Sequence, residues 1–117
     1  MNWTQEKVEH YLRVVREDLA TGRITSQMLQ MDEIIASCGT VACIGGWMKL
    51  RRHEAEKDYV GRHRTSLGEI SDGLSDERSE GLDALFYSFP GNVTPERAVQ
   101  AIDQWLEGSN DPWERYT

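Results

Sequence analysis

The sequence predicts an all-α fold, a compact single-domain bundle of about five helices that spans residues 1–117. Apolar residues recur at intervals of three and four in several segments, which is the helical period. Capping residues stand directly before these segments, and glycines follow several of them. No segment alternates apolar and polar positions with β-branched residues, as a half-buried strand does. A chain of 117 residues is long enough to bury one such core.

The first helix is predicted to begin after Thr4, an N-cap residue, and to end at Gly22 in a left-handed turn. Trp3, just before the cap, can pack on Val8 as a hydrophobic staple. The apolar stripe of this helix is Val8, Tyr11, Leu12, Val15 and Leu19.

Two interpretations stand for residues 24–36, a short helix or an irregular connection. The next helix is expected over residues 41–60, with Thr40 as its N-cap. The adjacent Gly45 and Gly46 lower its helix propensity by about 2 kcal/mol together. We expect close packing against another helix to offset that loss.

Residues 65–70 are predicted to add one further turn. A longer helix then starts at Ser75, and its acidic first turn complements the helix dipole. Its buried stripe is Leu82, Leu85, Phe86 and Phe89. The last helix has the clearest start, Thr94 as N-cap and Pro95 at the first helical position. Trp113 and Tyr116, beyond its end, are expected to fold back on the core, and an exposed aromatic pair at a binding surface is the alternative.

The net charge of −7 argues against direct binding of nucleic acid, which needs clustered Lys and Arg. Residues 49–64 carry six cations against three anions, a local charge of +3, so the remainder carries −10. Because Glu54, Glu56 and Asp58 stand at helical spacing from these cations, we interpret the basic segment as a solvated, salt-bridged helix face. Residues 69–83 hold six carboxylates and one arginine.

No apolar run approaches the ~18 residues that a membrane span needs. The first residues lack the basic and apolar regions of a secretory signal. Two cysteines do not make a disulfide framework. The expectation is a cytoplasmic protein with reduced thiols, no membrane association and no cofactor; a disulfide between the two cysteines is disfavoured by cytosolic redox conditions.

The segment Cys38–Trp47 combines both cysteines with three glycines and a tryptophan, a composition typical of a close approach of the backbone to another group. We interpret it as a structural motif in which a turn and cap lead into a thin helix face, and Trp47 anchors the core. Its members are Cys38, Gly39, Thr40, Cys43, Gly45, Gly46 and Trp47.

Two chemical alternatives remain for this segment. In the first, Cys38 or Cys43 is a nucleophile whose thiolate is stabilised at a helix N-terminus, with a histidine as base. His53 is the base assigned in that alternative; the other histidines are His10 and His63. In the second, a zinc ion stabilises the domain with four ligands, Cys38, Cys43, His53 and His63.

The order of three blocks, Cys38–Trp47, Ser75–Phe86 and Thr94–Ala98, resembles a group of small bacterial and phage proteins of unknown function. Their first block reads Cys-Gly-Thr-x-x-Cys-Ile-small-Gly-Trp, and Met31-Asp32 before the cysteines is similar to part of the same pattern. Gly45 departs from it, since alanine is more usual there. The resemblance covers residues 28–113. It implies a helical fold and a phage or mobile-element context, but no activity.

These observations favour a non-enzymatic, acidic protein-interaction module over an enzyme. We expect it to bind a protein partner with a basic nucleic-acid-binding surface, and the phage-like resemblance makes an inhibitor of a host-defence protein, acting in the host cytoplasm, the expected role. The residues assigned to partner binding are Asp72, Asp76, Glu77, Glu80 and Asp83.

Overall fold

The computed structural model describes residues 3–32, 34, 41–57, 67–91 and 93–113, and every regular element within these ranges is a helix. The helices are α1 (Gln5–Thr21), α2 (Ile44–Ala55), α3 (Gly68–Ser71), α4 (Asp76–Tyr87) and α5 (Pro95–Leu106). The predicted all-α fold is confirmed. None of these helices is long and apolar enough to cross a membrane.

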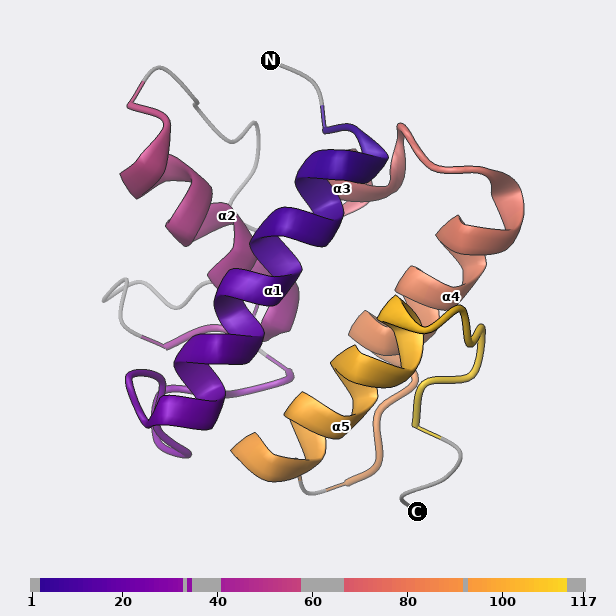
Figure 1. Ribbon diagram of the computed structural model, residues 1–117. Coiled ribbons are helices and arrows are strands. Elements are labelled where there is room, and N and C mark those ends of the chain that lie inside the picture. Colours follow the sequence, from indigo (N-terminus) through magenta and orange to yellow (C-terminus); the bar gives the residue numbers. More distant parts are fainter. Residues whose placement is uncertain (1–2, 33, 35–40, 58–66, 92, 114–117) are drawn as a thin grey trace.

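Helix α1 lies at the centre of the fold, with α2 on one side and α5 on the other (Figure 1). Helices α4 and α5 form an antiparallel pair. Arg78 at the start of α4 stacks 3.8 Å above the ring of Trp105 at the end of α5. The radius of gyration, 12.9 Å, is close to the ~13 Å of a compact chain of this size.

Local capping signals place three helix starts where the sequence predicts them. The hydroxyls of Thr4, Ser75 and Thr94 each accept a hydrogen bond from the backbone N–H three residues further on, at 3.2–3.4 Å. Helix α1 ends at Thr21, and its C-cap is Gly22, which has φ +84° as predicted for a left-handed turn. Trp113 folds back as expected, is buried, and its indole N–H donates to the Leu85 carbonyl at 3.1 Å, whereas Tyr116 lies outside the described residues.

The described part of residues 24–36 contains no helix, so the irregular connection is the correct interpretation. Leu29 forms a single parallel bridge with Ala42. Ala42 donates to the Met28 carbonyl, and Gln30 donates to the Ala42 carbonyl, both at 3.1 Å. The extended backbone buries Leu29 in the core.

This bridge also corrects the predicted start of α2. Because Ala42 is held in the bridge, the helix begins at Ile44 and its N-cap is Cys43 rather than Thr40. The helix ends at Ala55, short of the predicted end at residue 60. The predicted extra turn at residues 65–70 is α3, Gly68–Ser71.

Candidate functional site

Cys43 lies buried at the N-terminus of α2, with 1% of its surface exposed. Its sulfur accepts a hydrogen bond from the Gly46 N–H at 3.4 Å. Burial raises the pKa of the Cys43 thiol, and the N–H groups of Gly46 and Gly45 oppose that shift only in part. A protonated, buried thiol suits a helix cap and core packing better than it suits a nucleophile.

The adjacent glycines of α2 face different neighbours. A Cβ atom at Gly46 would overlap the carbonyl oxygen of Ile34, whereas one at Gly45 would stand 2.8 Å from the methyl groups of Leu67. The close neighbour of Gly46 is therefore the connecting segment, and the expectation of another helix at this place is wrong. Trp47 anchors the same contact, since its indole N–H donates to the Met28 carbonyl at 3.0 Å.

The structure brings together few of the groups that the chemical alternatives need. Cys38, Gly39, Thr40 and His63 lie outside the described residues. His53 is exposed ten residues along α2 from Cys43, roughly 15 Å along the helix axis, too far for a nucleophile–base pair. Within the described ranges, no three His, Cys, Asp or Glu side chains gather in a way that could hold a metal ion.

In the described part of the basic segment, residues 49–57, the cations of α2 are ion-paired as expected, but Lys49 and Arg52 are buried rather than solvated. Lys49 is 3% exposed and its ammonium lies 2.6 Å from the Glu69 carboxylate. Arg52 is fully buried, with its guanidinium 4.7 Å from the centre of the Trp3 ring. These cations hold α2 in the fold, because each is paired with a group distant in sequence.

A cluster that the sequence did not indicate forms around Glu56, just past the end of α2. Its carboxylate accepts hydrogen bonds from Lys7 at 2.7 Å and from the Tyr11 hydroxyl at 2.6 Å. The Lys7 and Tyr11 hydrogen bonds lower the pKa of Glu56 to about 2. Burial and the Glu56 carboxylate raise the pKa of Tyr11 to about 12. The partners lie 45 and 49 residues apart, so no local pattern could have found them.

The residues predicted to bind a partner lie together on and just before α4, and all five are exposed. They are Asp72, Asp76, Glu77, Glu80 and Asp83. None of the five takes part in an ion pair among the described residues, whereas carboxylates on α1, α2, α3 and α5 do. Glu77 alone accepts a side-chain hydrogen bond there, from Asn110 at 3.3 Å.

Three of these carboxylates share a stripe of α4 with an exposed aromatic residue. Asp76, Glu80, Asp83 and Tyr87 recur at intervals of four, three and four, which places them on one helix face. Tyr87 is 56% exposed and is the one large exposed hydrophobic residue in the described part of the chain. The opposite face of α4 carries the buried Leu82, Leu85 and Phe86.

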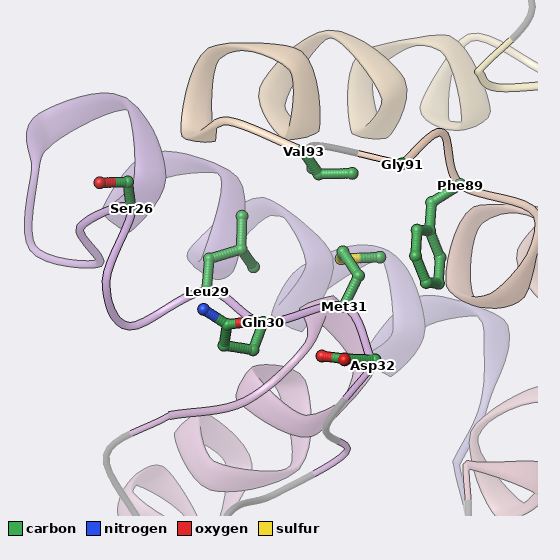
Figure 2. Close-up of a pocket in the computed structure, with 8 residues that line it drawn as sticks. All are labelled: Ser26, Leu29, Gln30, Met31, Asp32, Phe89, Gly91 and Val93. Atoms are coloured by element: carbon green, nitrogen blue, oxygen red, sulfur yellow. The ribbon is translucent and has the colours of Figure 1, made fainter.

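A hollow of about 250 Å³ lies where the end of α4 approaches the connection between α1 and α2. Figure 2 shows Met31 from the connection and Phe89 from the loop after α4 on its walls, with Asp32 next to Met31. The lining residues are Ser26, Leu29, Gln30, Met31, Asp32, Phe89, Gly91 and Val93. None of these eight is a lysine, arginine or histidine.

Comparison of the chain with protein-family models, with curated proteins and with solved structures finds no match. The resemblance carried by the three sequence blocks stays a prediction.

Proposed function

We propose that the protein is a non-enzymatic interaction module that binds a basic surface of a protein partner through the exposed face of α4. The observation that carries the proposal is the group of five exposed carboxylates without an ion pair in the described part of the chain. Carboxylates without local counter-ions are available to cations of another molecule, and such complementarity gives specificity and fast association.

The exposed Tyr87 supports this proposal. It follows Asp83 by one helical turn on the same stripe of α4. Tyrosine is among the residues that contribute most to protein interfaces, because it offers a large rigid surface with a polar end. In this stripe the carboxylates would attract the basic surface of the partner, and the tyrosine would add a large contact once the two proteins meet.

A surface on the partner that normally holds nucleic acid is the basic surface we favour. Asp76, Glu80 and Asp83 place three negative charges in a row along the axis of α4, which rises about 1.5 Å per residue. The phosphates of a nucleic-acid backbone also form a row of negative charges. Occupation of such a surface would make the protein an inhibitor of its partner, and a host-defence protein is the partner class that the phage-like resemblance suggests.

The test is affinity capture from a lysate of the source or host cell, with a charge-reversed variant and a matched control. The variant Glu80→Lys/Asp83→Lys reverses two charges on the α4 face. The control Glu96→Lys/Glu107→Lys makes the same change in net charge at the two ends of α5, in its first turn and at its C-cap, where both residues are exposed.

The wild-type protein and the α5 control should retain the same basic protein, and the α4 variant should lose it. Raised salt and added nucleic acid should both weaken the complex, because they screen or occupy the basic surface. If the α4 variant captures the same protein as the α5 control, or if salt has no effect, the proposed function is wrong.

A further inference from the structure

The hollow beside the end of α4 has the size of one side chain. Its volume, about 250 Å³, lies below the ~300–1,000 Å³ of pockets that take drug-sized ligands. Two residues of its wall, Phe89 and Gly91, follow the exposed Tyr87 by two and four residues along the chain.

The charge of its surroundings favours a cation. Asp32 is exposed and has no ion pair or side-chain hydrogen bond with any described residue. The C-terminus of α4, which carries the negative end of the helix dipole, has no basic residue in its last turn. Two independent features, a carboxylate and a helix end, therefore place negative potential beside a hollow that has no basic residue in its lining.

The walls favour a flat cation over a compact one. Met31 and Phe89 are partly buried apolar residues that pack against the core, and their side chains lie next to each other in the wall of the hollow (Figure 2). An aromatic ring attracts a cation placed over its face, and a guanidinium stacks there better than an ammonium because it is planar and more weakly hydrated. A guanidinium can also donate two hydrogen bonds to one carboxylate.

We propose that this hollow binds an arginine side chain of the partner, with Phe89 and Asp32 in the wall as contacts of the guanidinium. The inference rests on the proposed function, because it supplies the residue type that the partner inserts beside the acidic face. It adds a pocket specific for arginine to a surface that attracts positive charge and offers Tyr87 as an aromatic contact.

A probe as small as one amino acid tests the hollow separately from the α4 face. N-acetyl-arginine amide is titrated into the ¹⁵N-labelled protein, with N-acetyl-lysine amide and the uncharged N-acetyl-citrulline amide as comparisons. We expect the arginine probe to shift the backbone amide signals of Gln30, Asp32 and Gly91 in a saturable way. The lysine probe should bind more weakly, and the citrulline probe should cause no saturable shift.

Two variants assign the contacts. Asp32→Asn keeps the shape of an exposed side chain and should weaken arginine binding about tenfold, the loss typical of a charged hydrogen-bond partner. Phe89→Leu should weaken it as well, while the control Glu107→Gln, at an exposed position just past the end of α5, should leave it unchanged. Equal binding of arginine and citrulline, shifts confined to other residues, or no saturable shift would each overturn the inference.

The outcomes also separate this inference from the proposed function. A hollow that binds the arginine probe while the α4 charge reversal leaves partner capture intact would contradict the proposed function alone. Loss of capture in the α4 variant, without any binding of the arginine probe, would contradict the arginine pocket alone.

Discussion

The carbonyl oxygen of Ile34 occupies the space in which a side chain at residue 46 would begin. The backbone angles at position 46 do not require glycine. In the described chain only Gly22 and Gly108 have a positive φ, and residue 46 lies within helix α2. Position 46 needs glycine because the connecting segment passes directly over the first turn of α2. The contact therefore fixes the position of the connection that also lines the hollow.

The substitution Gly46→Ala should lower the melting temperature. Overpacking typically costs about 1–3 kcal/mol, and a backbone oxygen cannot move aside as a side chain can. The gain in helix propensity, up to about 1 kcal/mol, offsets only part of this. Thermal unfolding followed by circular dichroism measures the effect.

Gly45→Ala is the matched control, since it gains the same propensity one residue earlier in the same turn. Its new methyl group would meet the end of the Leu67 side chain at 2.8 Å, which can shift at lower cost. Gly46→Ala should therefore melt below Gly45→Ala. The opposite order would show that the connection does not press on α2.

Cys43 should react slowly with iodoacetamide in the folded protein at neutral pH. Burial raises the pKa of its thiol and excludes the reagent. The measurement uses the Cys38→Ser variant, so that Cys43 is the one thiol followed, and compares the native rate with the rate in concentrated urea. Rapid alkylation of the native protein would favour the nucleophile that we consider less suited to this site.

The helices with local signals could be predicted from the sequence, and contacts between distant residues could not. Thr4 and Thr94 predict the starts of α1 and α5 because the hydroxyl of an N-cap residue accepts a hydrogen bond from a backbone N–H only three residues further on. The start of α2 was misplaced because the bridge between Leu29 and Ala42 depends on a segment twelve or more residues earlier. A local pattern contains no information about such a partner.

The same distinction applies to the candidate site. Exposure of Glu80 and Asp83 follows from their helical spacing to the buried Leu82 and Leu85, which is visible in the sequence. The hollow was not predictable, because Met31 and Phe89 meet only after α4 packs beside the connection. The burial of Arg52 against Trp3 was missed for the same reason, since their contact spans almost half of the chain.

Acid should destabilise the protein partly through Glu56. A carboxyl group whose pKa falls from 4.5 to about 2 on folding contributes stability above pH 4.5, and this stability is lost as the pH falls towards 2. With discount for its partial exposure, we expect on the order of 1–3 kcal/mol. Urea unfolding at pH 7, 4.5 and 3 should show a smaller pH dependence for Glu56→Gln than for the wild type.

Glu54→Gln serves as the control for this measurement. Glu54 lies two residues away on α2, its side chain is 62% exposed, and it pairs with Arg51 within the same helix. Its substitution should leave most of the acid sensitivity in place. A Glu56→Gln variant with the same pH dependence as Glu54→Gln would show that the hydrogen bonds from Lys7 and Tyr11 do not stabilise the fold.

Removal of one member of the Lys49–Glu69 ion pair should lower the free energy of unfolding strongly, whereas replacement of both members by apolar residues should lower it only a little. Only 4% of the Lys49 side chain and 19% of the Glu69 side chain are exposed, and the pair joins α2 to the single turn of α3. Glu69→Ala removes the carboxylate that faces a buried ammonium, a loss of about 3 kcal/mol in the free energy of unfolding. Lys49→Met/Glu69→Leu should recover most of that loss, because apolar residues of similar size avoid the desolvation of both charges.

The exposed pair of Glu9 and Arg13, 3.7 Å apart, provides the comparison: Glu9→Ala should cost less than about 1 kcal/mol. If urea unfolding gives Glu69→Ala and Glu9→Ala the same stability, the buried pair does not hold α3 against α2.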